Sequence, residues 1–349
     1  MNAASQRIKM ARIMAGLSLN ELAKKTDYAI SKQAIGKYEL GDRKPSLEIL
    51  ITIAQAVNVK LDYFLRESEI QLGEINYRKQ DSLPKKKQQE IIEKTRDYLE
   101  RYLEAEDLVG EVIAFDDSLK KLRIKNLDNI EAIARQVRDV WQLGTNPIHN
   151  ITETLEEHGI KVLRLEDKIV DFSGMSTWVN DTIPVIVLGE NPIDRIRFTA
   201  MHELGHLLLD IDKYSIKEQE KICNKFAGAM LLPETSLKAE LGGHRKNIHL
   251  KELLLIKAQY GISPQAILYR CRELGLITET LFASQTKMMK DRGIWKEEIG
   301  EGVFKGKEES NRLFQLLCRG VSEDFITASK AASLYNKTVR AFRRELQEI

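Results

Sequence analysis

The segment Met201-His-Glu-Leu-Gly-His206 carries two histidines four residues apart, with a glutamate directly after the first. On an α-helix, residues i and i+4 lie one above the other on the same face. His202 and His206 could then bind one metal ion, at about 2.0–2.1 Å from each ring nitrogen. Glu203 would lie about 100° further round the helix, close to a water on that ion without being a ligand. The spacing therefore predicts a helix with a metal ion on one face.

The pattern His-Glu-x-x-His is typical of zinc metallopeptidases, in which the glutamate is the general base. The alternative is a buried amphipathic helix whose histidines are satisfied by hydrogen bonds. The other four histidines have no partner at helical spacing, and we expect solvated or capping positions for His149, His158, His244 and His249.

Size, charge and cysteine content limit the classes of protein. A chain of 349 residues predicts two or three domains. The net charge is only +2, but residues 1–66 hold eleven Lys or Arg against six Asp or Glu, which suggests a polyanionic partner for that segment. The three cysteines are widely separated and favour reduced thiols in a cytoplasm. No apolar run reaches about 18 residues and the start lacks a signal-peptide layout, so we expect a cytoplasmic protein without a membrane partner.

Residues 1–66 predict five short helices. Ser18-Leu-Asn-Glu21 is a capping box that begins the second helix. A third helix is expected at Ser31–Glu39, with Gly41 at its C-terminal cap, and Pro45-Ser46 begins a fourth.

This segment resembles the Xre/Cro/repressor-type helix-turn-helix family. The matching residues are Leu17-Ser18, Glu21-Leu22-Ala23, Ser31-x-Gln33-Ala-Ile35, Tyr38-Glu39, Gly41, Pro45-Ser46 and Leu61-x-x-Phe64-Leu65. The resemblance implies that residues 31–38 form a recognition helix in the major groove of double-stranded operator DNA. The turn at residues 26–30 is about two residues longer than the family's usual form, which affects the register of the base contacts.

Six residues are expected to contact DNA by this resemblance. Gln33 would pair with adenine, while Lys32 and Lys37 would reach guanine or phosphate. Arg43 and Lys44 suit phosphates, and Ser31 begins the helix. The family usually binds a palindrome as a dimer, so a homodimer is possible; the alternative is a helical module that binds proteins instead of DNA.

Residues 67–145 are predicted to form a helical connector, with a long amphipathic helix from Pro84 to about Glu106 and a second at about Asn129–Trp141. Residues 146–250 predict a small α+β domain. Its elements are a helix at Ile151–His158, a strand at Ile160–Leu165, and a hairpin of Ser176–Asn180 and Ile183–Leu188 with its turn at Asn180-Asp181. The helix with the histidines is expected to begin with Asn191 as its N-cap and to run to about Asp210.

A zinc site of this class needs a third protein ligand. Ser215-Ile-Lys-Glu218 is a capping box for the next helix, which a short loop makes an antiparallel neighbour. His206 lies about 6 Å before the first helix ends, and Glu220 about 7.5 Å after the second begins, so the two are level. Glu220 shares a face with small and apolar residues, whereas its rival Glu218 falls beside lysines. We therefore predict Glu220 as the third ligand.

Two further residues of this second helix are close to the predicted ligand. Asn224 lies one turn beyond Glu220 and could hydrogen-bond the outer ring nitrogen of a ligating histidine. Cys223 could in principle bind zinc, but its position between apolar neighbours favours a core residue.

Four segments resemble the ImmA/IrrE family of metallopeptidases: Phe172-Ser-Gly174, Arg197-Phe-Thr-Ala-x-His202-Glu-Leu-Gly-His206, Glu220-x-x-x-Asn224-x-Phe226-Ala227 and Leu231-Leu-Pro233. They span most of residues 146–235. The resemblance implies a gluzincin-like Zn²⁺ site and cleavage of a specific repressor under stress or phage induction. Glu203 would be the catalytic base. Arg195, Arg197 and Tyr214 are candidate donors to the oxyanion. The family's usual Ala before Asn224 is Cys223 here.

Residues 251–349 predict a helical C-terminal region without a motif that carries chemistry; its last helix is expected at Thr327–Gln347. The expected fold is mainly α with a small α+β domain: a five-helix helix-turn-helix domain at 1–66, the connector at 67–145, a gluzincin-like domain with a small sheet at 146–250, and helices at 251–349. The predicted function is a DNA-binding transcriptional regulator whose zinc endopeptidase cleaves a repressor or antitoxin-like partner, or inactivates the regulator itself. The alternative is a non-proteolytic regulator or antitoxin that uses the metallopeptidase fold as a sensor or interaction domain.

Overall fold

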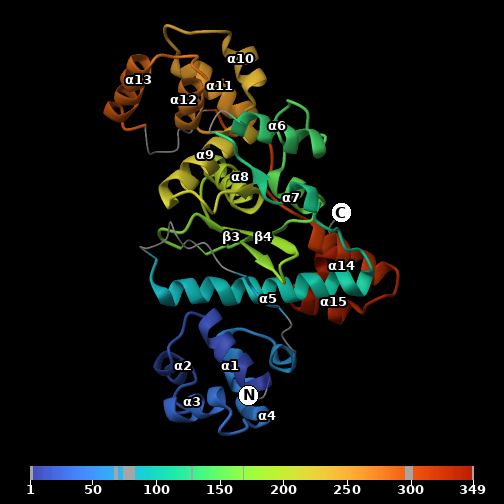
Figure 1. Cartoon of the computed structure of the whole chain (residues 1–349). Helices are drawn as coiled ribbons and strands as arrows, with labels where there is room; N and C mark the ends of the chain where they lie inside the picture. Colours follow the sequence, from blue (N-terminus) through green and yellow to red (C-terminus); the bar gives the residue numbers. More distant parts are fainter. Residues whose placement is uncertain are drawn as a thin grey trace. The chain divides into compact units, whose positions relative to one another are not determined.

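The structure is a computed structural model. It describes residues 3–66, 70–73, 83–126, 129–167, 169–294 and 302–347. The fold is mainly α with short strands in small sheets, as predicted (Figure 1). The chain divides into two compact units. Unit 1 combines Met1–Leu72, Lys79–Val112 and Leu313–Ile349, and unit 2 combines Gly73–Arg78 with Ile113–Arg312.

Unit 1 begins with the expected bundle of short helices. These are α1 (Ala3–Met14), α2 (Leu19–Lys25), α3 (Lys32–Leu40), α4 (Leu47–Val57) and the 3-10 helix η1 (Leu61–Leu65), packed around Ile8, Leu22, Ile35, Ile53 and Phe64. The predicted capping box is present, because Glu21 N–H donates to Ser18 Oγ and Ser18 N–H to the Glu21 carboxylate. Gly41 ends α3 with a φ of 82°. In the long turn between α2 and α3, Asp27 and Tyr28 both have positive φ.

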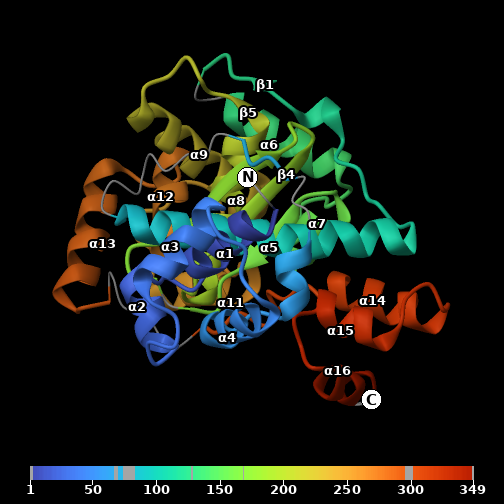
Figure 2. The same cartoon turned by 90° about the horizontal axis from the view of Figure 1, so that it is seen from below.

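The rest of unit 1 is the long helix α5 (Lys85–Val109) with three helices near the C-terminus: α14 (Arg312–Ser322), α15 (Ala328–Leu334) and α16 (Val339–Gln347). Tyr102 and Val109 of α5 pack against Leu316 and Phe342, and Figure 2 shows these helices beside one end of α5. The single helix predicted at residues 327–347 is therefore wrong. The chain turns at Asn336, whose φ of 55° is left-handed, so that the Phe342 ring meets the ring of Tyr335.

Unit 2 contains the predicted hairpin and strand. β3 (Gly174–Val179) pairs antiparallel with β4 (Ile183–Leu188), and β2 (Lys161–Arg164) pairs parallel with β4, giving the order β2-β4-β3. Asn180 and Asp181 have φ of 50° and 58°, which suits the tight hairpin turn. A second sheet, which the sequence did not predict, joins β1 (Leu122–Arg123) in parallel with β5 (Leu209–Asp210).

The helices of unit 2 are α6 (Asn129–Val140), α7 (Ile151–Glu157), α8 (Ile193–Leu208), α9 (Ile216–Leu231), α10 (Glu234–Leu241), α11 (Leu250–Tyr260), α12 (Pro264–Glu273) and α13 (Glu279–Asp291), with a short 3-10 helix, η2, at Asp117–Leu119. α8 carries both histidines, as predicted, but Asn191 does not cap it. Pro192 is the N-cap residue, and the Asn191 amide donates to the Phe172 carbonyl instead. α8 ends at Leu208 because the next two residues pair with β1.

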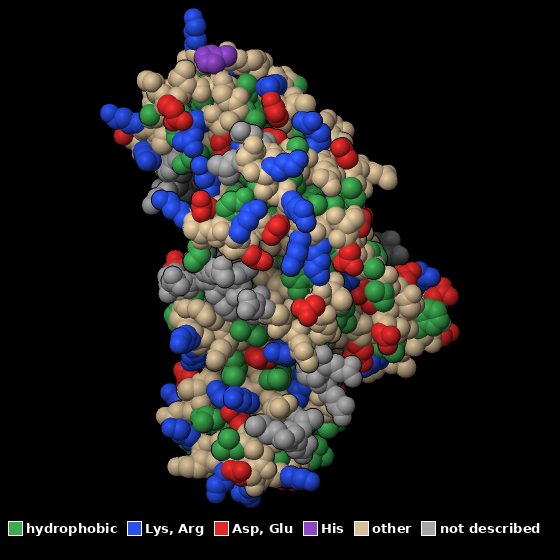
Figure 3. All heavy atoms as spheres, viewed as in Figure 1, with side chains coloured by type: hydrophobic (Ala, Val, Ile, Leu, Met, Phe, Trp, Pro, Cys, Tyr) green, Lys and Arg blue, Asp and Glu red, His purple; other side chains and the backbone are tan. Residues whose placement is uncertain are grey.

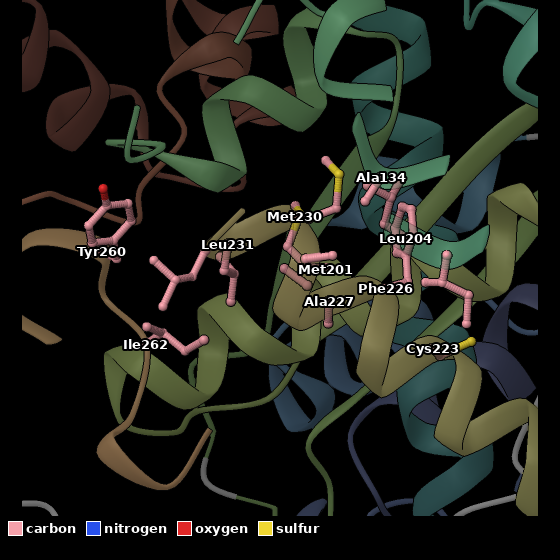
Figure 4. Packing of buried hydrophobic residues seen from close by; sticks show 14 of the residues in the cluster. Ala134, Met201, Leu204, Cys223, Phe226, Ala227, Met230, Leu231, Tyr260 and Ile262 are labelled. Atoms are coloured by element: carbon pink, nitrogen blue, oxygen red, sulfur yellow. The ribbon is translucent and has the colours of Figure 1, made fainter. Parts of the chain in front are cut away.

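α8 and α9 pack tightly against each other. Met201 and Leu204 of α8 meet Phe226 and Ala227 of α9 in the core of unit 2 (Figure 4). Gly205 permits this approach, because a Cβ there would lie 3.2 Å from Phe226 Cδ1 and 3.3 Å from Cys223 Sγ. Within the described ranges, none of the helices has both the length and the apolar character that crossing a bilayer requires.

Candidate metal centre

Three side chains from α8 and α9 meet at one point. His202 Nε2 and His206 Nε2 lie 3.2 Å apart. The Glu220 carboxylate oxygens lie 3.5 Å from His206 Nε2 and 3.7 Å from His202 Nε2. Donor atoms about 2 Å from a tetrahedral zinc ion stand about 3.3 Å from one another. The His₂Glu set therefore fits Zn²⁺ in donor type and in spacing, and it is the metal-binding group found among the described residues.

The antiparallel register of the two helices explains this meeting. His206 faces Glu220 while His202 faces Asn224, so residue numbers rise along one helix as they fall along the other. The start of α9 is fixed by its capping box, in which the Ser215 N–H and hydroxyl donate to the Glu218 carboxylate. These bonds hold the pKa of Glu218 below its ordinary value. Glu218, the rival ligand, is exposed and engaged in the cap.

The ring orientation of His202 is set by Asn224. Its Oδ1 lies 2.9 Å from His202 Nδ1. An amide oxygen only accepts, so Nδ1 carries the hydrogen and Nε2 presents its lone pair toward Glu220 and His206. His206 Nδ1 is buried and has no hydrogen-bond partner among the described residues. Cys223 is fully buried in the core between the helices, as expected for a structural residue.

A side chain of the neighbouring sheet forms a hydrogen bond with Glu203. Ser176 Oγ, on β3, donates to Glu203 Oε2 at 2.8 Å, and the glutamate is only 9% exposed. β3 reaches α8 this closely because of Gly174, where a Cβ would lie 2.5 Å from Thr199 Cγ2. Ser176 was not among the site residues predicted from the sequence. Its only signal was a hydroxyl inside a hairpin that is otherwise mostly apolar.

The three candidate oxyanion donors have different environments. Arg197 is excluded as an oxyanion donor because it is fully buried and forms an ion pair with Glu308. Its guanidinium also donates to the carbonyls of Ile148 and Tyr260. Arg195 is exposed and donates to Ser173 Oγ. Tyr214 is half-buried, and its hydroxyl lies 3.4 Å from the Ile124 carbonyl.

The Arg197–Glu308 pair ties α8 to residues 302–311. The other Glu308 oxygen accepts from the N–H groups of Ile151 and Thr152 at the start of α7, and the Phe304 ring lies 4.0 Å from the Arg197 guanidinium. Burial raises the pKa of Glu308 and lowers that of Arg197, and their mutual attraction opposes both shifts. The ion pair therefore has a structural role in unit 2.

The expected DNA-contacting residues lie together on α3 and in the loop after it. Ser31 is the N-cap of α3, and its hydroxyl accepts from Ala34 N–H. The side chains of the whole set are exposed: Ser31, Lys32, Gln33, Lys37, Arg43 and Lys44. Ile35 and Tyr38 on the opposite face are buried in the bundle core. On the face drawn in Figure 3, Lys and Arg side chains are interspersed with Asp and Glu, in keeping with the small net charge.

The remaining histidines lie outside the centre. His149, His244 and His249 are exposed, and His158 is stacked on Trp141 with its Nδ1 2.8 Å from the Thr154 carbonyl. None belongs to a metal-binding group in the described ranges.

Comparison with known proteins assigns two segments of the chain. A helix-turn-helix family model matches residues 8–64, and a model of the IrrE N-terminal-like domain matches residues 155–272. No curated protein and no solved structure matches the chain. The second match runs from α7 to α12 and contains the whole candidate metal centre. Both resemblances seen in the sequence are confirmed, and the chain joins a helix-turn-helix domain to an IrrE N-terminal-like, metallopeptidase-like domain.

Proposed function

We propose that this chain is a DNA-binding regulator whose second domain is a zinc-dependent endopeptidase. The observation that carries the proposal is the meeting of His202, His206 and Glu220 at zinc-like spacing, with Glu203 adjacent on the same helix. A catalytic zinc site has three protein ligands and one open position, and the centre offers three.

Each side chain then has a chemical role. Zn²⁺ held by His202, His206 and Glu220 would lower the pKa of a water to about 7 and would polarise the scissile carbonyl. Glu203 accepts the proton of the attacking water and delivers it to the leaving amine. Ser176 holds the Glu203 carboxylate in place through its hydroxyl, and Asn224 fixes the tautomer of His202.

The substrate that we propose is a protein of the repressor or antitoxin type, because the same chain carries a helix-turn-helix domain. In that domain, α3 would enter the major groove of operator DNA. Gln33 reads adenine, Lys32 and Lys37 contact guanine or phosphate, and Arg43 and Lys44 contact phosphates.

Glu203→Gln separates metal binding from catalysis. The zinc-loaded protein and this variant are incubated with a peptide library made from a digested proteome, and metal content is measured by mass spectrometry. We expect the variant to keep its zinc and to cut library peptides about 10²–10⁴ times more slowly. His202→Ala should lose the zinc, and a variant that retained it would disprove the centre.

The second candidate function is a non-proteolytic sensor, in which the same three side chains bind zinc without turnover. It predicts that wild type and Glu203→Gln bind zinc equally, leave the library intact and regulate alike in cells. That combination would remove the peptidase proposal.

A double substitution in α3 tests the helix-turn-helix domain. Gln33→Ala with Lys37→Ala should weaken binding to operator fragments selected from genomic DNA, and should reduce the slope of log K against log salt by about 1. Lys246→Ala removes the same charge from an exposed loop of unit 2 and serves as the control. Unchanged binding by the double variant would contradict a recognition role for α3.

A further inference from the structure

The outer edge of the sheet beside the metal centre carries Gly73, which belongs to residues 70–73, a described stretch between η1 and α5 that we call the linker. β3 stands at one end of the order β2-β4-β3. Gly73 N–H donates to the Trp178 carbonyl of β3 at 2.8 Å, and both residues belong to unit 2. Across the hairpin, Trp178 faces Pro184, which has no N–H to donate. The Trp178 carbonyl therefore points away from β4, to the side where Gly73 lies.

This edge lies next to the candidate catalytic base. Backbone groups of antiparallel strands alternate in direction, so Ser176, two residues before Trp178, presents its N–H and C=O to the same outer edge. The Ser176 hydroxyl binds Glu203. Two residues of strand span about 7 Å. The Gly73 backbone is thus about one strand repeat from the residue that holds the proposed base.

The linker approaches β3 as a peptide approaches the edge of a sheet. A Cβ on Gly73 would lie 3.0 Å from the Trp178 carbonyl oxygen and 3.8 Å from Thr177 Oγ1, so glycine permits this close approach. Addition of an extended segment to a sheet edge is a common way to bind peptides, because main-chain hydrogen bonds give affinity whatever the side chains.

We propose that the chain's own linker is a substrate of its metal centre, cut within residues 70–73. This inference rests on the proposed peptidase function. One C–N peptide bond is hydrolysed by one water: Glu203 takes the water's proton and passes it to the departing amine, and a carboxylate and a free amine result. The cut falls between η1 and α5. The cut therefore breaks the covalent connection between the helix-turn-helix domain and the unit that contains the candidate metal centre.

Self-cleavage is measured on the full chain after loading with Zn²⁺. Intact masses under denaturing conditions should show two fragments whose masses sum to that of the chain plus one water. The sequence of the new N-terminus places the cut. Digestion of the peptide library by the same preparation reports peptidase activity separately.

Gly73→Pro tests the pairing with β3. Proline removes the N–H that Trp178 accepts and keeps the preceding residue extended, so the strand conformation is retained while the hydrogen bond is lost. We expect self-cleavage to slow at least tenfold, with library digestion and the thermal unfolding midpoint unchanged. Gly243→Pro is the control, because Gly243 lies in an exposed loop where an added Cβ meets nothing within 4 Å. Gly73→Ala, which only crowds the Trp178 carbonyl, should slow self-cleavage less than proline.

The results that would contradict self-cleavage can be told apart from those that would contradict the peptidase function. A preparation that digests the library but leaves its own chain intact, or cuts it far from Gly73, overturns this inference and keeps the peptidase. Self-cleavage by Gly73→Pro at the wild-type rate also overturns it, as does cleavage that persists in Glu203→Gln. If the zinc-loaded protein digests neither its linker nor the library, the proposed function fails first and this inference with it.

Discussion

Ser176 is the residue whose contribution a single substitution would isolate best. Its hydroxyl is the described donor to Glu203 Oε2, and both side chains are nearly inaccessible to water. A hydrogen bond to a charged group contributes about 1.5–3 kcal/mol. We therefore expect Ser176→Ala to slow peptide-library digestion by roughly 10- to 150-fold while zinc content stays unchanged.

The control is a serine of unit 1. Ser322→Ala removes an exposed hydroxyl that donates to the Cys318 carbonyl, and digestion by this variant should match wild type. Threonine at position 176 keeps a hydroxyl and should restore part of the rate. If Ser176→Ala digests the library at full rate, its bond to Glu203 has no part in proton transfer.

Residues of the centre differ in how far the sequence could predict them. His202, His206, Glu220 and Asn224 lie on two consecutive helices joined by a short loop, so helical periodicity and the capping box at Ser215 were enough to bring them together. Ser176 comes from a strand 27 residues before Glu203. Its contact depends on how the sheet packs on α8, and no local pattern encodes that packing.

At the scale of elements, the centre depends on the close approach of α8 and α9. Gly205→Val would push its side chain into Phe226 and Cys223. Overpacking of this kind costs about 1–3 kcal/mol. Because Glu220 reaches the histidines across that contact, we expect zinc affinity to fall at least tenfold as well. Urea unfolding and zinc titration against a chelator measure the two effects.

The matched control is Gly36→Val on α3, where an added Cβ meets nothing within 4 Å. It should change neither zinc affinity nor the free energy of unfolding by more than about 0.5 kcal/mol. Equal zinc affinity in Gly205→Val and wild type would show that Glu220 is not held through this helix contact.

The cap of α2 gives a pH dependence with a defined sign. Hydrogen bonds from the Ser18 N–H and hydroxyl, and then Lys86, lower the pKa of Glu21 to about 2. A depressed folded pKa adds stability above the unfolded pKa, about 4.3, and loses it as pH falls toward 2. The gap in unfolding midpoint between wild type and Glu21→Gln should therefore shrink between about pH 5 and pH 2. A gap that stayed constant over this range would contradict the capping role.

Element boundaries were harder to predict than element types. The strands β2, β3 and β4 and the helices α5 to α9 occur where periodicity predicts them, with ends shifted by a few residues. The break at Asn336 has local signals that the prediction did not use: Asn336 adopts the left-handed conformation, and the Thr338 hydroxyl accepts from Ala341 N–H at the start of α16. The pairing of β1 with β5 joins residues 87 positions apart, beyond the reach of any local signal.

For the whole molecule, thiol chemistry provides one measurement of packing. Cys223 and Cys271 are buried and Cys318 is half-buried. Burial raises the pKa of the Cys271 thiol to about 12 and that of Cys318 above its ordinary value. Thiolate is the reactive form, so an aromatic disulfide reagent at pH 7 should label only Cys318, and slowly, in the native protein.

The same reagent should label all three thiols in guanidinium chloride. Cys318→Ala should abolish native labelling. Fast native labelling of Cys271 would show that the packing of α12 against its neighbours is not maintained in solution.

The two family matches cover residues 8–64 and 155–272, and short sequence motifs are sufficient to locate both domains. The role of residues 313–347 could not be predicted in this way. Their helices close the core cluster around Tyr102 and Val109 of α5, and an amphipathic pattern shows that a helix has a partner without showing which one.

The division of unit 1 among three separate stretches has a consequence for synthesis on the ribosome. Most of unit 2 is one continuous stretch, Ile113–Arg312, whereas unit 1 awaits residues 313–349. Domains generally fold as they leave the ribosome, N-terminal parts first. Unit 2, with the candidate metal centre, can thus be complete while α5 still lacks Leu316 and Phe342. A nascent chain then has His202, His206 and Glu220 in place while unit 1 remains open.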